Sequence, residues 1–201
     1  MDNTQSSTKR FTKSFPDVIE GKIDTVQFLE AAKDLVLLVE SLGKVFAPVK
    51  YDMHGNVEKI RKCYVVQMDA CLLQLMTTER SKGQTLATEG VLWLNRALLF
   101  FEINFQQIID VIRSNNYNVS MTHIFTVSYE GSVKKYHNWA SQKLFTMICK
   151  MCPNLQSILS SLGMDDDSEA FLANMTSYTQ TLTKVRSEID KYFVINKLFV
   201  D

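Results

Sequence analysis

The polar residues Asp52, Asn56 and Lys59 are spaced so that a helix would present them together. They stand at positions i, i+4 and i+7, and at about 100° per residue they fall within an arc of about 60°. A carboxylate acceptor, an amide that both donates and accepts, and a cation suit a neutral ligand dense in hydroxyl groups. The alternative is a solvated helix face, which commonly carries residues of these types.

The helix that must hold these three residues is predicted to run from near Asp52 to about Thr77. Its expected core stripe consists of Val57, Ile60, Tyr64, Met68, Cys71 and Leu75. The polar triad lies outside this stripe, and Gly55 beside it would let a ligand or another backbone come close. Continued along the helix, the triad leads to small apolar residues, which predicts the mouth of a pocket. These residues are Cys63, Val66 and Ala70.

Composition favours an all-α protein with one sizeable core. The chain has 201 residues, of which 46% are hydrophobic, with only 7 Gly and 3 Pro. Lys plus Arg and Asp plus Glu are balanced at 22 each, which argues against nucleic-acid binding. A polar start without a signal peptide, no apolar run near the ~20 residues of a membrane span, and four cysteines that fit a reducing compartment predict a cytoplasmic location. We expect residues 1–14 to be a loose tail and residues 15–201 a single domain.

The apolar periodicity predicts a series of further helices and no strand. Asp24 resembles an N-cap for a helix that ends near Phe46, before Pro48. A charged connection is expected over 78–83. The other predicted helices span about 85–113, 121–151 with a possible break at Gly131, 154–162, and from Asp167 toward the C-terminus, whose apolar end we expect to dock on the body.

The sequence offers little for catalysis or metal binding. Cys149 and Cys152 form a lone CxxC, and no second Cys or His pair stands at ligand spacing. No G-x-S-x-G or HExxH occurs, and Asp52 with His137 lacks a nucleophile. We therefore expect no enzyme activity, no metal and no cofactor.

Three stretches together resemble the glycolipid transfer protein family. They are Asp52-Met-His-Gly-Asn-Val-Glu-Lys59, Val91-Leu-Trp-Leu-Asn-Arg-Ala97 and Lys135-Tyr-His-Asn-Trp139. The resemblance extends from about residue 20 to the C-terminus in the same order and with similar spacing. It implies an all-α, two-layer helical sandwich of about eight helices enclosing an apolar lipid slot. It also implies non-vesicular transfer of sphingolipids between membranes, without enzyme activity.

The resemblance assigns a role to each candidate head-group residue. Asp52 matches the aspartate that binds the first sugar and the ceramide amide N–H, while Asn56 and Lys59 match residues that bind sugar hydroxyls. Trp93 matches the tryptophan beneath the sugar ring, and His137 the histidine that donates to the ceramide carbonyl. Taken singly, Trp93 would more simply be a core residue and His137 a structural one.

The predicted ligand is a neutral glycosphingolipid, a glycosylceramide. A sister branch that carries ceramide-1-phosphate has arginine at the position of Trp93 and a second arginine one turn earlier, where this chain has Glu89. A carboxylate would repel a phosphate that an arginine pair would bind. His54 and Asn95 depart from the family pattern and leave the sugar preference open. The alternatives are ceramide-1-phosphate transfer, a glycolipid sensor or scaffold, and a helical adaptor without a ligand.

Trp139 is the candidate membrane contact. On one helix it would point about 200° away from His137, so that an inward His137 would place Trp139 outside. An exposed indole suits the bilayer interface, and Lys134, Lys135 and Lys143 would add weak attraction to anionic lipids. The alternative is that Trp139 packs on a neighbouring helix. We expect transient, peripheral membrane contact and a monomeric carrier.

Overall fold

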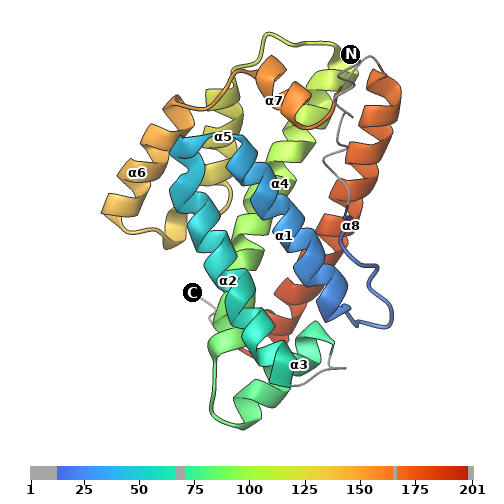
Figure 1. Ribbon diagram of the computed structural model, residues 1–201, viewed down its shortest axis with the longest axis vertical. Helices are drawn as coiled ribbons and strands as arrows, with labels where there is room; N and C mark the ends of the chain where they lie inside the picture. Colours follow the sequence, from blue (N-terminus) through green and yellow to red (C-terminus); the bar gives the residue numbers. More distant parts are fainter. Residues whose placement is uncertain (1–12, 67–70, 165–166, 199–201) are drawn as a thin grey trace, which may run out of the picture.

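The protein is all-α, as the sequence predicts (Figure 1). The structure, a computed structural model, describes residues 13–66, 71–164 and 167–198, and these form eight α-helices and two short 3-10 helices. None of the helices in these ranges is long and apolar enough to cross a membrane. The helices are α1 (Thr25–Ser41), η1 (Lys44–Phe46), α2 (Ala47–Val66), α3 (Leu72–Ser81), α4 (Leu86–Ser114), α5 (Met121–Glu130), η2 (Lys134–Tyr136), α6 (Trp139–Lys150), α7 (Leu155–Ser161) and α8 (Ser168–Ile195).

Helix α4 is the centre around which the other helices are arranged. It is apolar nearly all round, and it packs against α2, α8, α5 and α3, while α1 packs on α2 (Figure 1). Its N-terminus is capped by Glu79, a buried residue of α3 whose carboxylate accepts from the backbone N–H groups of Ala87 at 2.8 Å and Thr88 at 2.9 Å. The charged connection predicted over 78–83 is therefore wrong in part, because α3 extends to Ser81 and buries this carboxylate.

The first two helices differ from their predicted limits. Asp24 caps α1 as expected, accepting from the N–H of Gln27 at 2.7 Å. Pro48, however, does not simply terminate a helix at Phe46. It stands in the first turn of α2, where the missing proline N–H would have no intrahelical partner. Helix α2 consequently begins five residues before Asp52.

The predicted helix over 121–151 is three elements. Helix α5 ends at Glu130, just before Gly131, and η2 and α6 follow. A Cβ on Gly131 would lie 3.0 Å from the side chain of Ile103 in α4, so close packing accompanies the break. His137 has an extended backbone (φ −86°, ψ 136°) between η2 and α6, and Trp139 is the first residue of α6. The two residues do not share a helix, and the 200° argument for their opposite directions is wrong.

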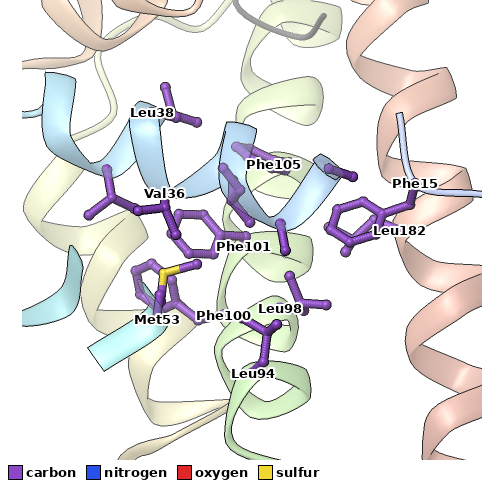
Figure 2. Packing of buried hydrophobic residues seen from close by; sticks show 14 of the residues in the cluster. Phe15, Val36, Leu38, Met53, Leu94, Leu98, Phe100, Phe101, Phe105 and Leu182 are labelled. Carbon is purple, nitrogen blue, oxygen red and sulfur yellow. The ribbon is translucent and has the colours of Figure 1, made fainter. Parts of the chain in front are cut away.

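The core joins α1, α2, α4 and α8 through large apolar side chains. Figure 2 shows Val36 of α1, Met53 of α2 and Phe101 of α4 turned toward the same interior, all of them buried. Phe15, also labelled in Figure 2, belongs to this core, and its ring centroid lies 5.9 Å from that of Tyr178 in α8. Buried apolar residues follow α4 from Ala87 to Ile112, so this helix is held in the core along most of its length.

The chain ends were predicted only in part. Residues 1–12 lie outside the described residues, and Lys13 forms an ion pair with Glu30 of α1 at 2.8 Å. Asp167 caps α8 as expected. Of the apolar C-terminal residues, Phe193 is buried, but Ile195 is 77% exposed, so this end is not wholly docked. Residues 199–201 lie outside the described part.

Candidate functional site

Two adjoining cavities open beside α2 and α4. We call the first the polar mouth; its volume is about 440 Å³, and it is lined by Asp52, Asn56, Lys59, Trp93, Tyr136, His137, Asn138 and Ser141. We call the second the apolar chamber; its volume is about 200 Å³, and it is lined by Pro48, Val49, Asp52, Met53, Trp93, Ala97, Phe100, Phe101, Val133, His137, Ser141, Leu144, Phe145 and Ile148. The residues common to both linings are Asp52, Trp93, His137 and Ser141. A ligand that fills both must place its polar-to-apolar junction at these four residues.

The apolar chamber adjoins the N-terminal end of the Asp52–Asn56–Lys59 triad, whereas the sequence predicted an apolar pocket at its C-terminal end. The sequence predicted a pocket along α2 toward Cys63, Val66 and Ala70, of which Ala70 and the side chain of Val66 lie outside the described part. The chamber is instead lined by Pro48 and Val49 of the first turn of α2 and by Met53. The Cys63 thiol instead lies 3.4 Å from the carboxylate of Glu79. The difference arises at Pro48, which does not end a helix but belongs to the first turn of α2, the turn that lines the chamber.

Helix α2 brings Asp52, Asn56 and Lys59 to the polar mouth, as their spacing predicts. Asn56 is buried at 4% exposure, and its amide lies 3.5 Å from the Asp52 carboxylate. Lys59 is half-buried, and Asp52 stands at the exposed rim. The solvated-face alternative does not fit Asn56, because a buried amide with one long hydrogen bond retains capacity for a further partner.

Gly90 of α4, not Gly55, is the glycine that shapes the mouth. A Cβ on Gly90 would lie 2.9 Å from the backbone oxygen of Asn56 and 3.1 Å from the Cβ of Lys59. Apart from its chain neighbours and the backbone of its own helix, no heavy atom of the described residues lies within 4 Å of a Cβ built on Gly55. Of the two alternatives predicted for Gly55, a ligand or another backbone coming close, the backbone approach is found at Gly90 instead, and it sets the spacing of α4 against the polar face of α2. The signal was available in the sequence as a glycine one turn before Trp93.

Trp93 is held at the boundary of the two cavities by Arg96 and Tyr136, which no motif in the sequence marks as site residues. The Arg96 guanidinium carbon lies 4.7 Å from the Trp93 ring centroid and 3.4 Å from that of Tyr136. The Trp93 and Tyr136 rings meet edge to face at 6.5 Å. A cation between two aromatic rings fixes the indole plane. Trp93 is half-buried and lines both cavities, so it is not a plain core residue.

His137 is held at both its ring and its backbone. The Tyr129 hydroxyl lies 3.0 Å from Nδ1 of His137. The side-chain amide of Gln142 donates to the backbone oxygen of His137 at 2.9 Å and to that of Lys134 at 3.1 Å. The Asn138 side chain then caps α6, accepting from the N–H of Ser141 at 3.0 Å. The non-helical residue is thus rigidly placed, although no periodicity in the sequence marks it.

The charges of Asp52, His137 and Lys59 act on one another. Burial raises the pKa of the Asp52 carboxyl, although the residue as a whole is exposed, while His137 and Lys59 lower it. Burial lowers the pKa of His137, and Asp52 opposes this by raising it. Desolvation dominates in both cases, so the neutral imidazole is favoured beside the carboxyl. A neutral histidine keeps one N–H donor and one acceptor nitrogen.

Trp139 lines neither cavity and is 70% exposed. The amine of Lys143 lies 3.9 Å from the centroid of its ring. Leu144 and Met147 of α6 are also exposed. The alternative that Trp139 packs on a neighbouring helix is therefore wrong, even though the helical argument for its direction was wrong as well.

The other residues singled out by the sequence lie outside the polar mouth. Glu89 is exposed and accepts from the Thr85 hydroxyl at 3.0 Å. Asn95 is buried, and its amide donates to Asp190 of α8 at 2.6 Å. His54 is exposed. None of these is among the residues lining either cavity.

The cysteines are free thiols. Burial raises the pKa of the Cys149 thiol to about 11, which disfavours the reactive thiolate. In the described part of the chain, no three histidine, cysteine or acidic side chains gather as the ligands of a metal would.

Comparison with known proteins points to one family. The family model described as glycolipid transfer protein matches residues 23–164. The chain is 36% identical over 158 residues to a glycolipid transfer protein of Aureobasidium melanogenum, covering 76% of each chain. It is 30% identical over 193 residues to the glycolipid transfer protein of Danio rerio, covering 85% of this chain and 92% of the relative.

Solved structures show the same fold. HET-C2, a fungal glycolipid transfer protein, is 29% identical, with a TM-score of 0.82 over 94% of this chain and 97% of its own. The FAPP2 structure, which concerns selection of simple glycosphingolipids by this fold, is 20% identical with a TM-score of 0.83, covering 98% and 97%. Human ceramide-1-phosphate transfer protein, bound to 12:0 ceramide-1-phosphate, is 16% identical with a TM-score of 0.78, covering 96% and 95%. The predicted two-layer helical sandwich is thereby confirmed.

Proposed function

The chain belongs to the glycolipid transfer protein family, and from that premise we propose that it carries a neutral glycosphingolipid between membranes. The observation that carries this proposal is the shared lining of the two cavities. Asp52, Trp93, His137 and Ser141 stand where a polar mouth meets an apolar chamber. A sphingolipid has its own polar-to-apolar junction at an amide, directly between its head group and its chains.

In the proposed complex, the head group occupies the polar mouth. The indole of Trp93 receives the C–H face of the sugar, while Asn56 and Lys59 bind its hydroxyl groups. Asp52 accepts from the amide N–H and a sugar hydroxyl, and His137 donates to the amide carbonyl. A buried polar group left unpaired costs about 1–3 kcal/mol, so a lipid lacking these partners is rejected.

The chains occupy the apolar chamber, where each buried CH₂ contributes about 0.8 kcal/mol. The bilayer offers nearly the same stabilisation, so the chains can leave it without a large net cost. Burial of the chains therefore keeps the lipid in solution during transit, and the polar mouth provides the selectivity. Neither role makes or breaks a covalent bond, so we propose a carrier and not an enzyme.

A neutral head group is supported by the charges at the mouth. A dianionic phosphate placed beside Trp93 would face the Asp52 carboxylate, and Lys59 is the only lysine or arginine among the described residues that line the mouth. The guanidinium of Arg96 lies against the rings of Trp93 and Tyr136 and does not line the mouth. Charge at this site thus disfavours ceramide-1-phosphate.

We further propose that the carrier meets membranes through α6, as a monomer working in the cytosol. The exposed Trp139 supports this, with Lys143 over its ring and Lys135 exposed nearby in sequence. An interfacial indole and a few cations give contact that is weak enough to reverse.

Transfer between vesicles tests the proposal. Donor vesicles carry glucosylceramide or ceramide-1-phosphate with matched acyl chains, and arrival in acceptor vesicles is followed over time. We expect fast movement of glucosylceramide and at least tenfold slower movement of ceramide-1-phosphate. Faster movement of the phosphorylated lipid would reverse the head-group assignment. Tight binding of glucosylceramide without transfer would instead indicate a sensor, and release of free ceramide would indicate a hydrolase.

A further inference from the structure

The Tyr129 side chain holds the imidazole of His137 in a defined way. Its hydroxyl lies 3.0 Å from Nδ1, and its ring stacks on Phe145 at a centroid distance of 4.1 Å and an angle of 11°. Tyr129 is 3% exposed and Phe145 is 9% exposed. Because the phenol ring is fixed by this stack, the position of its hydroxyl is fixed as well.

The direction of this hydrogen bond follows from the partners available to each group. Burial raises the pKa of Tyr129 to about 12 and lowers that of His137, so near pH 7 the phenol keeps its proton and the imidazole is neutral. Within the described residues, the Tyr129 hydroxyl makes this single hydrogen bond. If it accepted from Nδ1–H, its own hydrogen would be buried without an acceptor, at a cost of about 1–3 kcal/mol. The hydroxyl therefore donates to Nδ1.

We propose that Tyr129 is a positioning residue that fixes His137 as the Nε2–H tautomer and thereby makes the site selective for a secondary amide. This inference rests on the proposed function. With Nδ1 occupied by the Tyr129 hydroxyl, Nε2 carries the ring hydrogen. His137 and Asp52 line the same two cavities, so the ring offers a donor and the carboxylate an acceptor. An amide supplies the complementary carbonyl and N–H.

The opposite tautomer would not serve the same ligand. With the hydrogen on Nδ1, Nε2 would be an acceptor, and the site would present two acceptors to the ligand. The lipid carbonyl would then meet a lone pair and lose its donor. The tautomer therefore decides whether an amide fits.

Gln142 holds the backbone of His137, while Tyr129 holds its ring. Its amide binds the backbone oxygen of His137 at 2.9 Å, which fixes the extended residue that carries the ring. Since Tyr129 belongs to α5 and Gln142 to α6, the two helices hold His137 between them. The imidazole is thus set before any ligand arrives.

The first test is spectroscopic and needs no lipid. Nitrogen-15 NMR of the ligand-free protein reports the tautomer of each of the 3 histidines, and the exposed His54 and His123 serve as internal references. We expect the shifts of His137 to show nearly pure Nε2–H in the wild type and a substantial Nδ1–H population in Tyr129→Phe. An Nδ1–H wild type, or a variant with unchanged shifts, would overturn the proposal.

The second test asks whether the hydroxyl acts through His137 on the lipid amide. Tyr129→Phe keeps the stacked ring, and Tyr178→Phe is the control for loss of the hydroxyl of a buried tyrosine that lines neither cavity. We expect Tyr129→Phe to weaken glucosylceramide binding about tenfold, the loss of one hydrogen bond to the ligand. Binding of a glucosyl dialkylglycerol, which has the sugar and two chains but no amide, should change less than twofold.

A double-mutant cycle completes this test. In a His137→Ala background, Tyr129→Phe should have no further effect on glucosylceramide binding, because the hydroxyl would have nothing left to position. Equal losses for both lipids, or additive losses in the cycle, would assign Tyr129 a merely structural role. A wild type that binds neither glycolipid would end the proposed function, while the NMR result would still decide the tautomer.

Discussion

The polar mouth and the apolar chamber adjoin each other but are built in different ways. In the mouth, directional contacts fix the side chains: Arg96 lies against the Trp93 and Tyr136 rings, and Tyr129 and Gln142 hold His137. The chamber is walled largely by side chains that make only apolar contacts. Such walls repack at modest cost, whereas a directional contact is either made or lost.

The volumes of the two cavities also differ: the polar mouth has about 440 Å³ and the apolar chamber about 200 Å³. An engineered cavity of about 150 Å³ accommodates one benzene molecule, so a chamber of about 200 Å³ is too small for two long chains. If the chamber receives the chains as proposed, it must widen when a lipid enters. The wall formed by Leu144, Phe145 and Ile148 belongs to α6, which lies at the edge of the molecule and packs mainly on α5 (Figure 1). The mouth is therefore formed in advance, while the capacity for chains is adjustable.

The largest effect is expected from removing the carboxylate of Asp52, which lines both cavities. Asp52→Val should reduce glucosylceramide transfer more than a hundredfold, because about 3 kcal/mol of charge-assisted hydrogen bonding is lost.

Since burial raises the pKa of this carboxyl, the wild type should lose binding on acidification at a higher pH than an ordinary aspartate would allow. Titration of glucosylceramide binding from pH 7 downward checks this.

The raised pKa of Asp52 also predicts that a neutral residue at this position stabilises the fold at pH 7. A carboxyl whose folded-state pKa is raised destabilises the fold where it is ionised, so Asp52→Asn should have an equal or higher Tm at pH 7. That difference should fade as the pH falls through the raised pKa. Asp110 is exposed, and Asp110→Asn is the control, which should change neither the Tm nor glucosylceramide transfer. A soluble Asp52→Val protein that keeps most of its transfer activity would remove Asp52 from the site.

The difference between mouth and chamber also decided what the sequence could predict. The triad on α2 follows from helical spacing alone, and the long α4 follows from its unbroken apolar pattern. His137 could be assigned only through family resemblance, because its position depends on contacts from Tyr129 and Gln142 in other elements. The chamber was placed at the wrong end of the triad, since periodicity gives the face of a helix but not which neighbours cover it.

Filling the chamber should separate chain binding from head-group binding. Ala97 lines the chamber on α4, and Ala97→Phe would occupy much of the space that the chains must enter. We expect about tenfold weaker binding of a long-chain glucosylceramide, consistent with about 1–3 kcal/mol of overpacking. A short-acyl glucosylceramide should lose less. Ala173→Phe, on the exposed face of α8, is the control. Equal losses for both chain lengths would mean that the chains do not use this chamber.

A smaller effect is expected from disturbing the spacing of α2 and α4 at the mouth. In Gly90→Ala, a Cβ only 2.9 Å from the backbone oxygen of Asn56 must push the two helices apart. We expect a destabilisation of about 1–3 kcal/mol and a few-fold loss of glucosylceramide binding. Gly55→Ala is the matched control, because it has free space and should stabilise α2 by about 0.5–1 kcal/mol. Thermal unfolding of the two variants should therefore give opposite shifts in Tm.

The smallest effect on binding is expected outside both cavities, at Trp139. Trp139→Ala removes an indole that is 70% exposed and lines neither cavity, so affinity for a soluble short-chain glucosylceramide should stay within twofold of the wild type. Transfer between vesicles should nevertheless slow about threefold to tenfold, because the protein would dwell less at the bilayer interface. The exposed Tyr117→Ala serves as the control. If both rate and affinity fell together, Trp139 would be supporting the site and not the membrane step; if neither changed, α6 would not be the membrane-facing helix.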